Sequence, residues 1–193
     1  MNSRLSEYSY CFIVCEGTNE EAAVNWILEN NSFVIDQSKV NMDYCRARTK
    51  SSSEEMIADI TTYDYDGKVA ILYVHDSKNE KWHGIISKSC AKELKDHNFE
   101  VIDVITSPEI EIICFILDEK LYKKWNKATK KKPSDFLREN ARCKNIKQKG
   151  AFRTFFASFD DFVCACKKYK QNHNSNFYTL FDLIDQRART SDM

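Results

Sequence analysis

Carboxylates follow three apolar segments of this chain, each within a few residues of the point where the segment ends. They are Glu16 after residues 10–15, Asp76 after residues 69–74, and Glu109 and Glu111 after residues 99–105. Carboxylate oxygens suit Mg²⁺, which takes a few protein carboxylates and leaves other positions to water and phosphate. The same acids could instead only cap the helices that follow. Because acids follow three separate segments, we favour a shared metal site.

The apolar segments alternate with segments of helical periodicity. Strands are expected at residues 10–15, 32–35, 69–74 and 99–105, and helices at residues 19–31, 51–63 and 81–97. This β-α-β-α-β-α-β order predicts a small, four-stranded, parallel α/β sheet of Rossmann-like type with helices on both faces. The carboxyl ends of parallel strands share one edge of a sheet, where ligands bind. The acids that follow the strands are therefore expected at one site.

The pattern changes after residue 107 to segments that are mostly helical. Helices are expected at residues 107–125, 132–143, 158–171 and 176–188. We therefore divide the chain into an α/β domain, residues 8–117, and a helical C-terminal extension, residues 118–193, packed on it.

Charge is balanced overall but uneven along the chain. The 193 residues include 29 Lys plus Arg and 29 Asp plus Glu, so no net charge draws the protein toward nucleic acid or membrane. Residues 120–132 (KLYKKWNKATKKK) nevertheless contain seven lysines and no acid. These lysines could simply lie at a solvated helix end. Their number favours contact with a phosphate backbone.

The eight cysteines show neither Cys-x-x-Cys spacing nor a nearby His at zinc-finger spacing. The first ten residues lack the apolar core of a secretion signal, and no apolar run reaches the roughly 20 residues that span a bilayer. We expect a cytoplasmic protein with reduced thiols, no disulfide and no membrane partner.

Residues 12–24 (FIVCEGTNEEAAV) resemble the first motif of TOPRIM domains, the Mg²⁺-binding fold of topoisomerases, primases and OLD-type nucleases. In that motif a hydrophobic strand is followed by Glu-Gly and then by a second acid. Glu16 matches the motif glutamate and Gly17 its tight turn, and Glu20 matches the helix acid of OLD-type members. This resemblance implies a TOPRIM-like fold.

Two further segments carry weaker resemblances to the same group. Residues 71–80 (ILYVHDSKNE) are similar to the second TOPRIM motif, a strand ending in Asp-x-Asp, and Asp76 matches its first aspartate. Residues 107–117 (SPEIEIICFIL) are similar to the Pro-x-x-Glu segment of RloB-like and OLD-type proteins, where Glu111 matches the acid that begins a helix. The resemblance covers about residues 10–117.

The chain departs from the second motif at Lys78, which stands where the second aspartate belongs. Either Asn79 or Glu80 substitutes for that ligand, or the site holds one metal, or catalysis is lost. Lys78 could also neutralise a phosphate in the transition state. The sequence leaves these alternatives open.

The resemblance implies a metal-dependent nuclease that hydrolyses DNA or RNA phosphodiesters with Mg²⁺ or Mn²⁺, in anti-phage defence and with a second defence protein such as an ATPase. The alternative is a catalytically degenerate TOPRIM-like module that binds nucleic acid, a nucleotide or a partner protein. The implied metal ligands are Glu16, Asp76, Glu80 and Glu111, and the implied catalytic residues are Glu16, Glu20, Asp76 and Lys78. The expected nucleic-acid contacts are Lys123, Lys124, Lys127, Lys130, Lys131 and Lys132.

The three tryptophans also bear on nucleic-acid binding. Trp26 and Trp125 occupy apolar positions of expected helices and are predicted to be core residues. Trp82 lies in a loop-like stretch beside the expected site, where it could stack on a base, although simple packing is the favoured interpretation.

Overall fold

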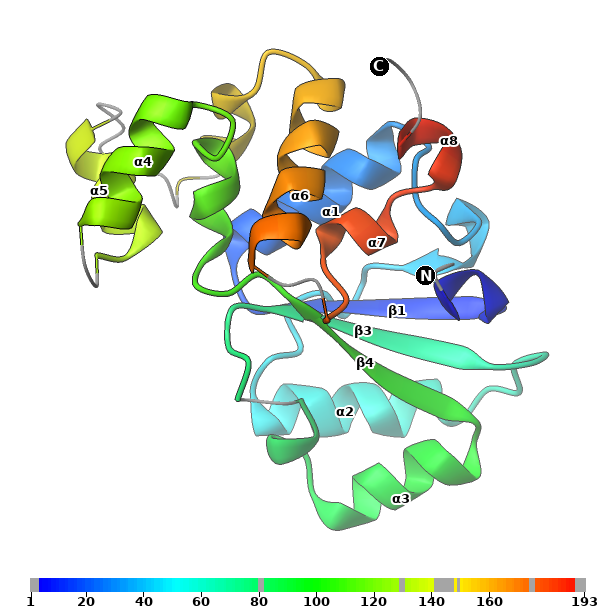
Figure 1. Ribbon diagram of the computed structural model, residues 1–193. Helices are drawn as coiled ribbons and strands as arrows, with labels where there is room; N and C mark the ends of the chain where they lie inside the picture. The colour runs from blue at the N-terminus through cyan, green and yellow to red at the C-terminus, as the bar shows by residue number, and fades with distance from the viewer. Residues whose placement is uncertain are drawn as a thin grey trace.

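Four parallel strands form the sheet that positions the acidic residues. The structure is a computed structural model that describes residues 4–79, 82–128, 131–140, 148, 150–173 and 176–189. The strands are β1 (Tyr10–Cys15), β2 (Val40–Asn41), β3 (Val69–His75) and β4 (Phe99–Ile105). Their order in the sheet is β2-β1-β3-β4, and every neighbouring pair is parallel. The prediction of a small, four-stranded, parallel α/β sheet with flanking helices is therefore confirmed (Figure 1).

Helices cover both faces of this sheet. The α-helices are α1 (Thr18–Glu29), α2 (Lys50–Ile60), α3 (Lys88–Asp96), α4 (Glu119–Lys127), α5 (Pro133–Asn140), α6 (Phe159–His173), α7 (Leu180–Leu183) and α8 (Gln186–Arg189). Short 3₁₀ turns are η1 (Arg4–Glu7), η2 (Gln37–Lys39), η3 (Trp82–Gly84), η4 (Ile110–Cys114) and η5 (Phe152–Phe155). Figure 1 shows α2 and α3 below the sheet, α1, α6 and α7 above it, and α4 and α5 to one side.

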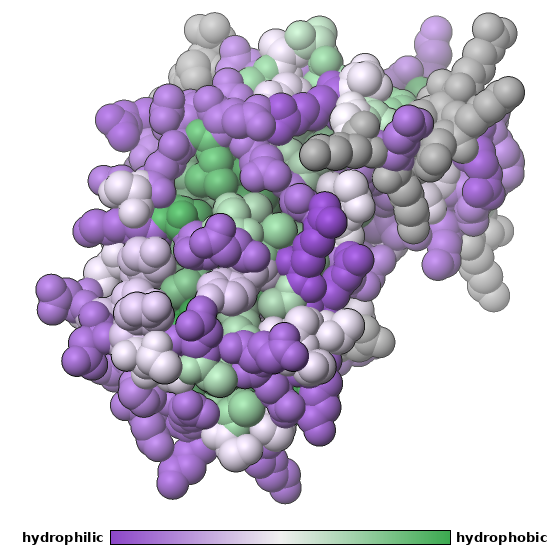
Figure 2. All heavy atoms as spheres, turned by 180° about the vertical axis from the view of Figure 1, so that it is seen from behind, coloured by the Kyte–Doolittle hydropathy of each residue, from purple (hydrophilic) through white to green (hydrophobic). Residues whose placement is uncertain are grey.

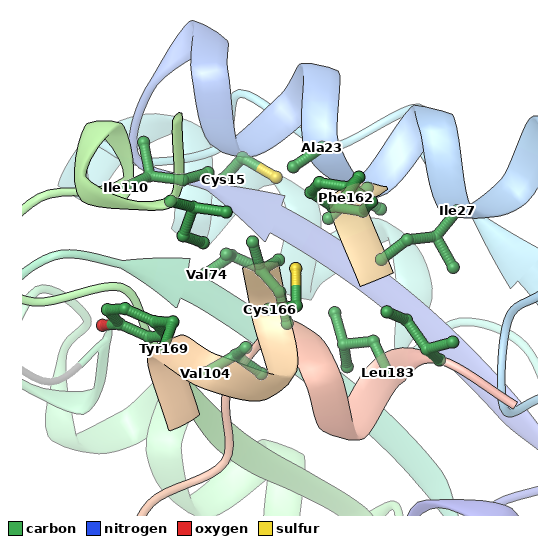
Figure 3. Packing of buried hydrophobic residues seen from close by; sticks show 14 of the residues in the cluster. Cys15, Ala23, Ile27, Val74, Val104, Ile110, Phe162, Cys166, Tyr169 and Leu183 are labelled. Atoms are coloured by element: carbon green, nitrogen blue, oxygen red, sulfur yellow. The ribbon is translucent and has the colours of Figure 1, made fainter. Parts of the chain in front are cut away.

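The alternation of side chains along the inner strands divides the core into two layers. On β3, Leu72 and Val74 pack among α1, α6 and α7, whereas Ile71 and Tyr73 pack toward α2 and α3. Figure 3 shows the first layer, in which Phe162 and other α6 side chains lie over the strands. All seven residues of β3 are buried, as predicted for a strand covered on both faces.

The predicted strand at residues 32–35 is wrong, because the second strand is formed by Val40 and Asn41. Residues 32–35 are apolar since Phe33 and Ile35 are buried in the core. Their backbone instead meets the C-terminal segment, where Val34 N–H donates to Leu183 O at 2.8 Å. The apolar composition of residues 32–35 indicated burial correctly. Their backbone hydrogen-bonding partner, however, lies about 150 residues further along the chain.

The structure shortens or divides three of the predicted helices. The predicted helix at 176–188 is divided into α7 and α8, and Ile184 between them pairs with Phe33. The predicted helix at 81–97 begins only at Lys88, after the η3 turn, with Ser87 as its N-cap. The predicted helix at 107–125 is divided into η4 and α4, because Asp118 caps a new helix with two hydrogen bonds to backbone N–H groups. This division leaves Glu109 and Glu111 on a tight turn beside the sheet.

The C-terminal helices share the core of the α/β region. Phe162, Cys166 and Tyr169 of α6 belong to the same buried cluster as Ile13 of β1. The face seen in Figure 2 is largely hydrophilic, with a narrow band of hydrophobic residues between polar side chains. No helix within the described ranges is long and apolar enough to cross a bilayer. The seven cysteines that the structure describes form no disulfide with one another; Cys143 lies outside those residues.

Candidate metal centre at the carboxyl edge of the sheet

A polar pocket of about 300 Å³ lies where β1, β3 and β4 end. It is lined by Glu16, Gly17, Thr18, Asn19, Glu20, Arg48, Asp76, Glu109 and Glu111. The strand order places the end of β1 next to that of β3. The chain leaves β1 toward β2 at one edge of the sheet and leaves β3 toward β4 at the other edge. This is the switch point at which open α/β sheets bind ligands.

The turn after β1 brings Glu20 into the pocket. Gly17 is the N-cap of α1, with an extended backbone and no side-chain hydrogen bond. A β-carbon at Gly17 would overlap the Glu20 carboxylate. Glycine therefore leaves the space in which the Glu20 carboxylate lies against the pocket wall.

Glu16 connects the ends of the two central strands. Its Oε2 accepts the backbone N–H of Asp76 at 2.9 Å, so the first acid holds the loop that carries the second. Arg48, from the segment after β2, donates to the backbone carbonyl of Glu16. The side chains of Glu16 and Asp76 are half-buried, so both reach the pocket and solvent.

Glu20 has the most strongly perturbed carboxyl of the pocket. It is 7% exposed, and its pKa is raised to about 8. Burial is the largest cause, and the negative charges of Glu111, Glu16 and Asp76 raise the pKa further. The Thr106 hydroxyl, 3.4 Å from Glu20 Oε1, is the hydrogen-bonding side chain beside it.

The third strand end contributes two buried acids. Glu111 is 4% exposed, and its Oε1 accepts a hydrogen bond from the Asn19 amide at 2.9 Å. Glu109 is 8% exposed and accepts the N–H of Ser134, the second residue of α5, at 2.9 Å. The pKa of Asp76 is raised, mainly by burial and then by repulsion from Glu16 and Glu109.

Negative charge therefore exceeds positive charge in this pocket. Its lining holds five carboxyl groups and one cationic side chain, Arg48. Lys132 lies at the rim, with its Nζ 3.9 Å from Glu109 Oε1. Within the described residues, no three acidic, histidine or cysteine side chains are arranged to enclose an ion. The donors are nevertheless all oxygen, and Mg²⁺ typically uses only one or two protein carboxylates with water and phosphate, so the lining fits that ion.

Comparison with protein-family models, curated proteins and solved structures finds no match to this chain. The function must therefore be argued from the site itself.

The structure brings four residues predicted from the sequence into one pocket: Glu16, Glu20, Asp76 and Glu111. Lys78 is placed elsewhere. Its Nζ lies 3.4 Å from the carbonyl oxygen of His173 and 5.6 Å from the centre of the Phe177 ring. Lys78 therefore does not face the acids. Glu80 lies outside the described residues.

The lysines of the basic segment have different surroundings. Lys123 pairs with Glu119 of the same helix, Lys124 donates to Asn140, and Lys131 pairs with Glu139. Lys127 is exposed in the last turn of α4. Lys132 alone among the described lysines pairs with an acid of the pocket. Lys130 lies outside the described residues.

Sequence reasoning gives too little weight to three lining residues. Glu109 is readily interpreted as a helix cap, although its position two residues before Glu111 is a usable signal of a shared site. Asn19 stands at the start of the helix expected at residues 19–31, where an asparagine is readily interpreted as an N-cap. Arg48 gives no signal, because it lies between elements and reaches the site through the fold.

Proposed function

We propose that this protein is a metal-dependent phosphodiesterase acting on nucleic acid, with the acidic pocket as its active site. The observation that carries the proposal is the convergence of acids from three strand ends in one pocket with a deficit of positive charge. Buried like charges are costly unless a cation neutralises them. A divalent cation would relieve the repulsion that raises the pKa values of Glu20 and Asp76.

Each acid has a role that follows from its position. The ion would be held by Glu16, Asp76 and Glu111. Glu109 would lie at the edge of the site, next to Lys132. A bound Mg²⁺ or Mn²⁺ would activate water and stabilise negative charge on a phosphate. Without the ion, Glu20 holds a proton near neutral pH, because its pKa is about 8. A bound cation would lower that pKa and favour the ionised form, which can accept a proton. Glu16 also fixes the Asp76 loop through its backbone hydrogen bond.

The choice of nucleic acid as substrate is supported by the cations next to the pocket. Lys131 and Lys132 immediately precede α5, whose second residue donates to Glu109. The neighbouring helix α4, which packs against α5, carries further lysines. A polyanion needs local positive charge here, because the chain has no net charge and the pocket itself is acidic.

The test compares metal binding and strand cleavage in the wild type, Glu16→Gln and Glu55→Gln. Glutamine at position 16 can still accept the Asp76 N–H, so the loop is retained while the charge is removed. Glu55 is an exposed acid on α2, remote from the pocket, and serves as the matched control. At a Mg²⁺ concentration about 100 times its Kd, stabilisation of about 2.7 kcal/mol is expected in the wild type and the control.

Glu16→Gln should lose both that stabilisation and Mg²⁺-dependent cleavage of labelled DNA and RNA strands. Equal responses of Glu16→Gln and the wild type would contradict the proposal. Metal binding that depends on Glu16, with nucleic acid bound but never cleaved, would instead identify a binding module.

A further inference from the structure

A second cleft of about 320 Å³ adjoins the acidic pocket, and the proposed function does not use it. It lies between the end of α4 and the start of α5. Its lining consists of one tryptophan, two prolines, an alanine and two lysines, together with an asparagine: Trp125, Pro108, Pro133, Ala128, Lys131, Lys132 and Asn126. Its lining is therefore mostly apolar, with two lysines contributed by the segment that precedes α5.

Glu109 forms the boundary between this cleft and the acidic pocket. It lines the acidic pocket, whereas the preceding residue, Pro108, lines the cleft. Lys132 Nζ lies 3.9 Å from Glu109 Oε1, and Ser134 N–H donates to Glu109 Oε2 at 2.9 Å. A ligand in the cleft therefore lies beside the carboxylates, with Lys132 between the two spaces.

The indole ring of Trp125 is held in a fixed position. Its Nε1 donates to the carbonyl oxygen of Lys131 at 2.9 Å. Phe115 packs against it edge-on, with 5.9 Å between ring centres, and the side chain remains half-buried. A fixed aromatic surface loses little conformational entropy when a ligand covers it.

This combination matches the chemistry of a nucleotide. Bases stack on aromatic side chains irrespective of their identity, and lysines neutralise the attached phosphate. In a duplex each base is already stacked and paired, so it cannot occupy a cleft without being extruded. The cleft therefore favours an unpaired nucleotide.

We propose that this cleft binds one unpaired base of a single-stranded nucleic acid, stacked on Trp125, while the neighbouring phosphate lies at the acidic pocket. The inference rests on the proposed function, since it assigns the substrate class of the same site. It extends that function from nucleic acid in general to single strands and unpaired ends.

The test measures binding of a fluorescein-labelled single strand of about ten thymidines, and of a duplex of equal length, by fluorescence anisotropy. Ca²⁺ replaces Mg²⁺ so that the strand is not consumed. Trp125→Ala should weaken single-strand binding about tenfold or more, whereas Trp125→Phe, which keeps an aromatic ring, should retain most of it. Tyr63→Ala, which removes an aromatic side chain that is 59% exposed and outside the cleft, should bind as the wild type does.

Thermal unfolding of each variant shows whether it is folded, and the comparison of single strand with duplex on the wild type keeps the test decisive if Trp125→Ala is not. Single-strand binding that is unchanged in a folded Trp125→Ala variant would overturn the inference, as would equal affinity of the wild type for duplex and single strand.

A parallel cleavage assay with Mg²⁺ separates the two proposals. If Glu16→Gln loses cleavage but single-strand binding does not depend on Trp125, the cleft proposal is rejected and the nuclease proposal is retained. Binding that depends on Trp125 without any cleavage rejects the nuclease and retains the cleft.

Discussion

Two buried carboxyl groups in this protein, Asp182 and Glu20, have similar exposure and opposite surroundings. Asp182 is 6% exposed and Glu20 is 7% exposed. Asp182 accepts the backbone N–H and the hydroxyl of Thr179, at 2.8 and 3.2 Å, and pairs with Lys170. Glu20 has the Thr106 hydroxyl beside it and acids around it.

The difference separates a structural acid from a functional one. The charge of Asp182 is matched by a lysine and by the N-terminus of α7, so its burial stabilises the fold. The charge of Glu20 is opposed by its neighbours, so its burial destabilises the fold when the group ionises. Groups of this second kind persist where a ligand supplies the missing charge, and they indicate functional sites. Four variants test this contrast.

The largest effect is expected from Glu20→Gln. The pKa of Glu20 is about 8 in the folded protein, against 4.5 for an ordinary glutamate, so the folded state binds the proton more tightly than the unfolded chain does. The stability that this proton confers is complete below about pH 4.5 and is lost as the pH rises through about 8, to a total of about 5 kcal/mol. Without metal, Glu20→Gln should therefore unfold at a higher denaturant concentration than the wild type at pH 8. At pH 5 the two proteins should unfold at about the same denaturant concentration.

Glu21→Gln is the matched control for this comparison. Glu21 is the next residue along α1 and pairs with Arg46 at the surface. Its replacement should leave the pH dependence of unfolding as it is in the wild type. A Glu20→Gln variant with an unchanged pH dependence would show that Glu20 is not strained by its neighbours.

Asp182→Ala should act in the opposite direction and destabilise the protein by about 3 kcal/mol. The change removes the cap of α7 and leaves the half-buried Lys170 without its acidic partner. Asp182→Asn, which can still cap the helix, should fall between the alanine variant and the wild type in chemical denaturation. A loss below about 0.5 kcal/mol in Asp182→Ala would refute the structural role.

Gly17→Ala tests the space in which the Glu20 carboxylate lies. The new methyl group would overlap that carboxylate and displace it, whereas the extended backbone at position 17 accepts alanine without strain. We expect a reduced thermal shift on addition of Mg²⁺, with a stability change of about 1 kcal/mol. Gly84→Ala is the control, because a β-carbon there meets no atom within 4 Å. Equal metal responses of the two variants would exclude a role for this space.

The smallest effect is expected from Lys78→Ala. Lys78 contacts the His173 carbonyl and the Phe177 ring, outside the acidic pocket. Its removal should change stability by less than about 1 kcal/mol and leave the Mg²⁺-induced thermal shift intact. If the metal response were lost, Lys78 would act at the site despite its position.

The strands that carry the acids could be predicted because they are apolar and buried. Residues 10–15 and 99–105 match β1 and β4 at both ends, and the segment 69–74 is one residue shorter than β3. The order of strands and helices then predicted that the acids after the strands lie at one edge of the sheet. Residues 32–35 were misassigned since apolar composition reports burial, while strand pairing depends on a distant partner.

The direction of side chains in loops could not be predicted. Lys78 follows β3 in the sequence, as the second aspartate of the TOPRIM motif does, yet its contacts come from residues about 95 positions further on. Trp82, considered for base stacking, is completely buried and donates to Ser53. Trp125, predicted to be a core residue, is half-buried: it packs against the core and also lines the second cleft. Helical periodicity identified its apolar environment but not the opening beside it.

The core shared by the first and last parts of the chain has a consequence for biosynthesis. Leu5 and Ile184 belong to one buried cluster, and α6 supplies much of the cover over β1 and β3. While the ribosome has produced only the strands, Ile13 and Val74 have no helix of the C-terminal part to cover them. Folding of this face must therefore wait until α6 and α7 have emerged. We expect the nascent chain to depend on chaperones until synthesis is nearly complete, and a fragment ending at residue 117 to aggregate.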